Sequence, residues 1–92
     1  MGEAVTMKAV RRQTEHEWRL IYDAFLASPQ WAHKRERILK RAHAICECCS
    51  TQRATQVHHT SYPRPLTLDA LDNQPDWQLR AICSTCHKTL HT

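Results

Sequence analysis

The sequence predicts a small α+β domain in which two N-terminal helices precede two short strands and a C-terminal helix. Apolar residues recur with a helical period over residues 14–43, short runs typical of strands follow, and two C-x-x-C pairs flank these runs. A chain of 92 residues buries little apolar surface, so such a fold needs an additional staple. We expect a flexible leader at residues 1–13 and one domain at 14–92, with a helical part (14–43) and a stapled part (44–92).

Both predicted helices have clear N-terminal signals. Thr14 and Glu17 match a capping box, ahead of an apolar face that runs to about Ala27. Ser28 can cap the second helix, and Pro29 at its first position loses no hydrogen bond. The outer side of this helix is expected to carry five basic residues: Lys34, Arg35, Arg37, Lys40 and Arg41. They form either an ordinary solvated face or a surface that contacts phosphate groups.

The cysteines predict a structural zinc site. Cys46 and Cys49 form one C-x-x-C pair, and Cys83 and Cys86 form the second. Four thiolates at about 2.3 Å complete a closed tetrahedral Zn²⁺ site, and the sequence lacks the βαβ context of a redox pair. The fifth cysteine, Cys48, is a spare thiol or an alternative ligand.

Cysteine usage and hydropathy also predict the cellular compartment of the protein. An odd cysteine count without a signal sequence does not fit a secreted disulfide framework. No apolar segment approaches the roughly 20 residues that cross a bilayer. We therefore expect a cytoplasmic protein, and its net charge of +4 favours an anionic partner over a membrane.

Four histidines cluster around the second cysteine pair and the predicted strands. His58 and His59 end the predicted strand ATQVHH, and His87 and His91 lie four residues apart on the predicted C-terminal helix. This spacing brings two imidazoles onto one cation, whereas a fraying turn that complements the helix dipole is the simpler alternative. The second strand is predicted at WQLRAIC, and Trp77 is expected in the core or an interface rather than as a platform on which bases stack.

Three segments together carry a family resemblance: SPQWAHKRERILKRAHAICECC, ATQVHHTSY and LRAICSTCHKTLH. With these motifs, residues 22–92 resemble the small HNH endonucleases of bacteria and phages. The resemblance implies a ββα-metal unit, in which two strands and a helix surround one catalytic cation, here stapled by the four-cysteine zinc knuckle.

The resemblance also assigns roles to individual residues. It implies that His58, His87 and His91 hold one divalent ion, which could be Zn²⁺, Ni²⁺, Mn²⁺ or Mg²⁺, and that His59 is the general base. Three imidazoles lean towards the first three of these ions. Gln78 occupies the family's asparagine position. Its amide can keep the structural role, although its side chain is longer than that of asparagine by one methylene.

The expected function is hydrolysis of DNA phosphodiester bonds by a metal-dependent HNH endonuclease, as nicks or double-strand cuts. Arg64, in the long loop at residues 60–77, is either a phosphate contact or an ordinary exposed arginine. The alternative function is a catalytically weak or inactive zinc-stabilised module that binds nucleic acid or protein. DNA is the expected partner, and a homodimer or a larger phage or bacterial complex is left open.

Overall fold

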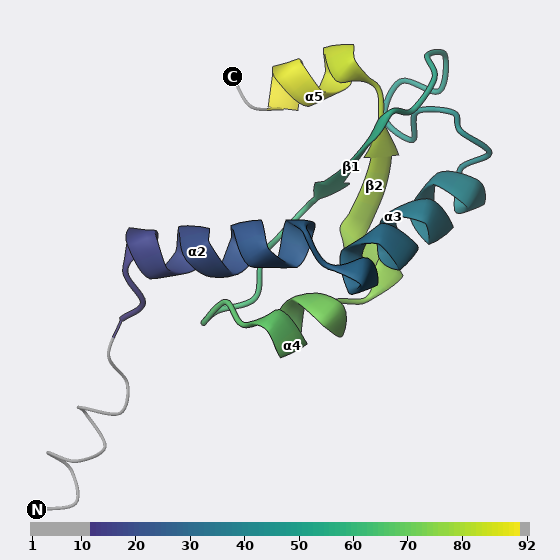
Figure 1. The fold of residues 1–92 in the computed structure, drawn as a ribbon. Coiled ribbons are helices and arrows are strands. Elements are labelled where there is room, and N and C mark those ends of the chain that lie inside the picture. The colour runs from purple at the N-terminus through teal and green to yellow at the C-terminus, as the bar shows by residue number, and fades with distance from the viewer. Residues whose placement is uncertain (1–11, 91–92) are drawn as a thin grey trace, which may run out of the picture.

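The computed structural model describes residues 12–90, which form an α+β fold with a two-stranded antiparallel sheet (Figure 1). In chain order the elements are α2 (Glu15–Leu26), α3 (Pro29–Arg41), β1 (Gln56–His59), α4 (Leu68–Asp72), the 3₁₀ helix η1 (Asp76–Gln78), β2 (Leu79–Ile82) and α5 (Ser84–Leu90). No helix in this span is long and apolar enough to cross a bilayer.

The two N-terminal helices begin where their capping signals place them. The Thr14 hydroxyl accepts a hydrogen bond from the Glu17 N–H at 3.1 Å, and the Glu17 carboxylate accepts one from the Thr14 N–H at 3.3 Å. The Ser28 hydroxyl accepts from the Trp31 N–H at 3.2 Å, and Pro29 opens α3. Each cap satisfies N–H groups that have no partner inside a helix, so both predicted starts are confirmed.

β1 and β2 pair in a register that sets the positions of the two adjacent histidines. His58 lies opposite Arg80, and His59 lies opposite Leu79. The predicted second strand was too long at its start, because residues 76–78 form the 3₁₀ helix η1. As a result Trp77 does not alternate faces on a strand, and its side chain is 68% exposed instead of packing in the core.

Among residues 12–90, the buried apolar side chains form three small clusters. The first joins α2, α3 and the loop around α4, the second joins α3 to both strands, and the third lies at the cysteines. Their buried members are Phe25, Trp31, Leu66 and Leu71; Ile38, Ala54, Leu79 and Ala81; and Cys46, Ile82 and Cys83. Small separate clusters bury little apolar surface, so hydrogen bonds and ion pairs between the elements contribute a larger share of the stability.

The segment at residues 60–77 is more ordered than a simple loop. It contains α4, whose first turn is capped by the Thr67 hydroxyl through the Ala70 N–H at 3.0 Å. Gln13 holds this segment from the other side, because its amide donates to the Leu66 carbonyl and accepts from the Leu66 N–H. Most of the expected leader, residues 1–11, lies outside the described residues, while Gln13 is tied to the domain.

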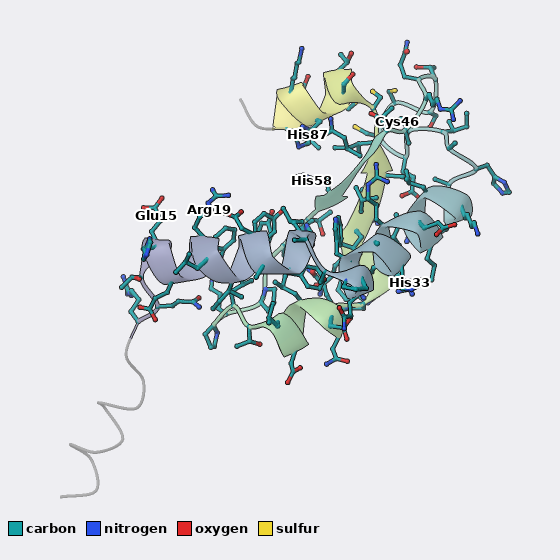
Figure 2. All side chains as sticks on the ribbon, in the orientation of Figure 1. Glu15, Arg19, His33, Cys46, His58 and His87 are labelled. Carbon is teal, nitrogen blue, oxygen red and sulfur yellow. The ribbon has the colours of Figure 1, made fainter. Side chains whose placement is uncertain are left out.

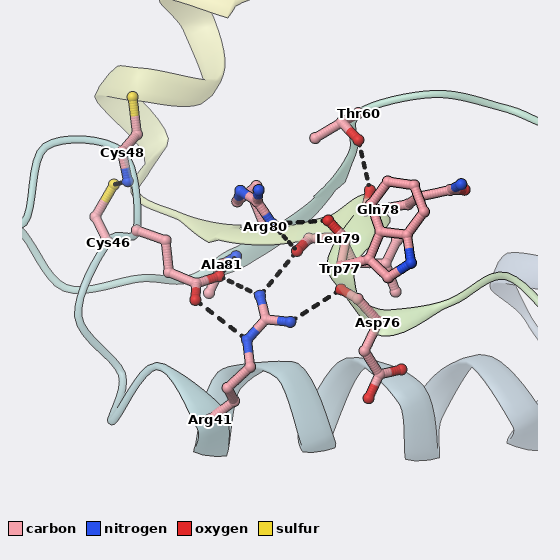
Figure 3. A network of polar contacts seen from close by, with 11 residues as sticks. Arg41, Cys46, Cys48, Thr60, Asp76, Trp77, Gln78, Leu79, Arg80 and Ala81 are labelled. Atoms are coloured by element: carbon pink, nitrogen blue, oxygen red, sulfur yellow. Dashed lines mark hydrogen bonds and ion pairs between the residues drawn. The ribbon is translucent and has the colours of Figure 1, made fainter.

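Arg41, at the end of α3, links the helix to β2 and to the first cysteine loop (Figure 3). Its guanidinium contacts both carboxylate oxygens of Glu47 and donates to the carbonyl oxygens of Asp76 at 2.9 Å and Leu79 at 2.8 Å. Glu47 in turn accepts from the Ala81 N–H at 2.8 Å. One planar group thus satisfies acceptors on three separate segments, which a lysine ammonium cannot reproduce.

We expect Arg41→Lys to lower the free energy of unfolding by roughly 1–2 kcal/mol, because it leaves the part-buried Leu79 carbonyl and the exposed Asp76 carbonyl without their shared donor. Urea unfolding measures the change. Lys40→Gln is the matched control, since the Lys40–Glu36 pair is exposed and should contribute less than about 0.5 kcal/mol. Equal destabilisation by the two variants would contradict a special role for the Arg41 network.

Candidate active site and metal centre

Four cysteine sulfurs converge where the first cysteine loop meets the start of α5. The Sγ atoms of Cys46, Cys49, Cys83 and Cys86 all lie within 4.8 Å of one another. Tetrahedral zinc with sulfur at about 2.3 Å requires sulfur atoms roughly 3.8 Å apart, so the cluster fits one such ion with small adjustments. Cys48 is exposed and lies outside the cluster, so the spacing of the two pairs correctly identified the four converging thiols.

Hydrogen-bond donors around Cys46 and Cys49 favour the thiolate form that binds metals, whereas the neighbouring Cys83 thiol raises the pKa of Cys86. The N–H groups of Cys48 and Cys49 point at the Cys46 sulfur, each at 3.4 Å, and the Cys86 N–H points at the Cys83 sulfur at 3.4 Å. Hydrogen bonds from the Thr51 hydroxyl and from nearby N–H groups lower the pKa of Cys49 to about 5. A metal-binding thiol must lose its proton, so this environment suits a ligand.

His58 lies on the face of β1 that looks towards α5, together with His87 (Figure 2). Their ring centroids are 6.2 Å apart and the rings are nearly perpendicular. The structure therefore brings together two of the three histidines that the sequence grouped as ligands of one cation. The third, His91, lies outside the described residues.

His59 points to the opposite face of β1 and is enclosed by aromatic rings. It stacks between Trp31 and Tyr62, with both centroid distances 5.1 Å, and Tyr22 meets its edge at 5.8 Å. The side chain is only 3% exposed. Adjacent strand residues face opposite sides, so two neighbouring histidines occupy very different environments.

Enclosure changes the proton affinity of His59. Burial, together with smaller electrostatic effects of His58 and the buried Lys34, lowers its pKa to about 4. The imidazole is therefore neutral at pH 7 and holds a free lone pair.

Gln78 is tied to the residues that directly follow the histidine pair. Its carbonyl accepts from the N–H and the hydroxyl of Thr60, both at 2.9 Å. Its side-chain oxygen accepts from the Gln74 amide at 2.9 Å, and that amide also donates to the Ser61 carbonyl at 2.7 Å. Gln74 is 4% exposed, and sequence reasoning missed it, because nothing in its spacing marks it as a partner of Gln78.

Several of the predicted DNA-contacting cations are engaged within the domain. Lys34 was expected on the outer face of α3, but it is 6% exposed and donates to the Asp72 carbonyl at 2.9 Å. The expected placement of Lys34 was wrong because α4, which the sequence did not reveal, lies against this side of α3 and offers the Asp72 carbonyl as a partner. Arg37 forms a two-pronged pair with Asp76, in which the Nε–Oδ2 and Nη2–Oδ1 distances are 2.8 and 2.7 Å.

The remaining predicted cations are more accessible. Arg35 is exposed and donates to the Thr55 carbonyl at 2.8 Å, and Lys40 pairs with Glu36 on the exposed side of α3. Arg64 is exposed in the loop before α4.

The comparison with solved structures agrees with this arrangement. No family model and no curated protein matches the sequence. Among solved structures, the chain is similar to the HNH endonuclease of the deep-sea thermophilic bacteriophage GVE2, solved with manganese ion. The two share 25% identity and superpose with a TM-score of 0.68, covering 83% of this chain and 84% of that chain.

The chain has the fold of an HNH endonuclease. In this HNH fold, β1, β2 and α5 form the ββα unit, with His58 on the first strand and His87 on the helix. The predicted fold class and the family resemblance are confirmed. α2 and α3 precede this unit and enclose the second histidine of the pair.

We expect the purified protein to contain one zinc ion per chain, and Cys49→Ser to lose most of that metal and unfold at lower temperature. A structural zinc site contributes directly to folding free energy. Metal analysis and thermal unfolding measure both effects. Cys48→Ser is the control and should keep its metal; loss of zinc in that variant would show that Cys48 is a ligand.

The burial of His59 predicts that stability falls as the pH drops from about 6.5 to about 4. The unfolded chain takes up a proton near pH 6.5, whereas the folded ring resists protonation down to about pH 4, so stability is lost through this window. The full effect is on the order of 3 kcal/mol. Urea unfolding gives the free energy of unfolding of wild type and of His59→Gln at each pH, and the difference between them removes the contribution of the cysteines. Two parallel pH profiles would contradict the prediction.

Proposed function

We propose that this protein is a metal-dependent endonuclease that hydrolyses DNA phosphodiester bonds. The observation that carries the proposal is the approach of His58 and His87, at 6.2 Å, within the ββα unit of an HNH fold. Imidazole nitrogens bind divalent transition metals, and the two rings come from separate elements, as the ligands of one ion would.

We propose His58 and His87 as ligands of a catalytic cation, with His91, which lies outside the described residues, as the third ligand. When bound, a divalent cation there would neutralise charge that develops on the phosphate and help the 3′ oxygen to leave. The four cysteines would hold a separate structural zinc. The manganese in the phage GVE2 enzyme supports Mn²⁺ as one candidate, beside Zn²⁺, Ni²⁺ and Mg²⁺.

His59 is the proposed general base. It is neutral at pH 7 because burial lowers its pKa, so it can accept a proton from an attacking water. The ring is covered by Tyr62, which lies in the segment after β1. We infer that this segment shifts when DNA binds, because only then can a water reach the ring.

Gln78 and Gln74 are proposed to position the segment that follows the histidine pair. The Gln78 backbone carbonyl holds Thr60, and the Gln74 amide holds Ser61 while it also donates to the Gln78 side-chain oxygen. Gln78 thus takes the place of the family's asparagine, and Gln74 extends its reach. Neither side chain needs to touch the substrate for this role.

We propose that the predicted cations contact DNA, and they differ in how accessible they are to phosphate groups. Arg64, Arg35 and Lys40 are exposed and can meet phosphate groups directly. Arg37 and Arg41 are already bonded to Asp76 of η1, so they can offer a phosphate only their remaining N–H groups. Lys34 can reach a phosphate only if its hydrogen bond to the Asp72 carbonyl of α4 is broken. We therefore rank the first three ahead of the others.

A binding module without catalysis is the second candidate function. The near-complete burial of His59 favours it, because a base that no water reaches cannot act. Such a module would keep the cysteine site and bind nucleic acid or protein through the same frame.

Cleavage of supercoiled plasmid, with Mg²⁺, Mn²⁺, Ni²⁺ or Zn²⁺ added in turn, tests the proposal. We expect metal-dependent nicking or linearisation that falls at least about 100-fold in His59→Ala, because a positioned base contributes about that much or more. His58→Ala and His87→Ala should weaken the response to added metal. His33→Ala is the control, because this exposed α3 histidine faces neither site (Figure 2).

Metal content and thermal unfolding should be measured for every variant, so that loss of activity is not confused with loss of fold. Equal cleavage by His33→Ala and His59→Ala would remove His59 from the mechanism. Absence of cleavage by wild type with every metal would favour the binding module, and Gln78→Asn would then show whether the glutamine is responsible.

A further inference from the structure

Trp77 is a large aromatic side chain with little to hold it. Its indole is 68% exposed and belongs to none of the three core clusters. Within residues 12–90, the ring stacks on no other aromatic ring and its N–H donates no hydrogen bond. The other two tryptophans, Trp18 and Trp31, both pack in the aromatic cluster around α2 and α3. Single exposed apolar side chains are common on protein surfaces, so Trp77 is distinguished by the backbone support and the charge around it.

The backbone that carries this ring is, in contrast, firmly held (Figure 3). Each of the three carbonyl groups of η1 accepts a hydrogen bond from a side chain: Asp76 from Arg41, Trp77 from Arg80, and Gln78 from Thr60, all at 2.9 Å. These ties come from α3, from β2 and from the segment after β1. They fix the position of η1, so the exposed indole is presented on a rigid support and does not depend on its own packing.

Arg80 supplies positive charge beside Trp77. Its Nη1 donates to the carbonyls of Trp77 at 2.9 Å and Leu79 at 3.1 Å, which orients the guanidinium. Its Nη2 and Nε have no partner among the described residues. This differs from Arg37 and Arg41, whose guanidinium groups are paired with carboxylates. An oriented guanidinium with free N–H groups is well suited to a phosphate.

The sheet register places this pair beside the proposed cation site. Arg80 lies directly opposite His58 in the antiparallel pair, so their side chains share one face of the sheet. That is also the face on which His87 approaches His58. A phosphate bound by Arg80 would therefore be near the histidines, and a neighbouring nucleotide would extend towards Trp77.

We propose that Arg80 and Trp77 form a strand-binding surface for DNA with unpaired bases next to the cleaved bond. Arg80 takes a backbone phosphate, and Trp77 stacks on an unpaired base. This inference rests on the proposed nuclease function and names its substrate class as single-stranded DNA, or duplexes with single-stranded tails or branches. In an intact duplex the bases stack on each other, so the indole would have no base face to meet.

The test measures binding without added divalent metal, so that it does not depend on cleavage. The probes are a single-stranded oligonucleotide of about 12 nucleotides and a duplex of the same sequence. Single-stranded DNA should quench part of the tryptophan fluorescence in wild type, and Trp77→Ala should remove this quenching. Because base stacking is sequence-tolerant but strong, we expect Trp77→Ala to weaken single-strand binding about tenfold and duplex binding less than about twofold.

Arg80→Gln should weaken binding of both probes and lower the slope of log affinity against log salt by about 0.7 for the single strand. Arg53→Gln is the control, because Arg53 is an equally charged, exposed arginine on the loop that follows the first cysteine pair. Trp77→Phe should keep part of the stacking. If Arg80→Gln proves unstable, Arg80→Lys and the Trp77 variants still decide the outcome, because the exposed indole supports no core cluster.

Unchanged single-strand affinity in Trp77→Ala, or an equal loss for single strand and duplex, would overturn the proposal. So would a wild type that binds neither probe, which would leave Trp77 as a contact for a protein partner. Plasmid cleavage decides the nuclease function separately: a protein that binds as expected but cuts nothing would contradict that function and not the strand-binding surface.

Discussion

The convergence of the four cysteine sulfurs is the constraint on which the rest of this small domain depends. It joins the loop after α3 to the start of α5, on either side of the two strands. β1 and β2 contain only four residues each, and a two-stranded sheet of this size is not stable alone. A metal at the cysteines would close the chain around the strands, and the position of α5, which carries His87, follows from that closure.

The two-residue repeat of a strand explains how adjacent histidines lie in different environments. His58 faces α5 and remains accessible to a cation, whereas His59 faces the helices and is enclosed by Trp31 and Tyr62. Enclosure keeps the second ring unprotonated and fixed in orientation, at the cost of solvent access. The same feature therefore supports a base and explains why the segment that carries Tyr62 matters.

The basic residues of α3 show why charge by itself does not define a DNA surface. Lys34, Arg37 and Arg41 act mainly as cross-links that hold α4, η1 and β2 against the helix. They position the sheet, and through it Trp77 and Arg80. The surface proposed for DNA then lies on the sheet and η1, next to the histidines.

The sequence by itself determined the features that depend on local chemistry. The capping box at Thr14 and the cap at Ser28 act over a few residues, and the spacing within each C-x-x-C pair is equally local, so these features were predictable, as was the α+β class. The tertiary structure decided the rest, because Lys34 meets a carbonyl 38 residues away and Arg41 contacts two such distant carbonyls. The exposure of Trp77 and the role of Gln74 likewise follow from contacts and chain geometry that no local pattern encodes.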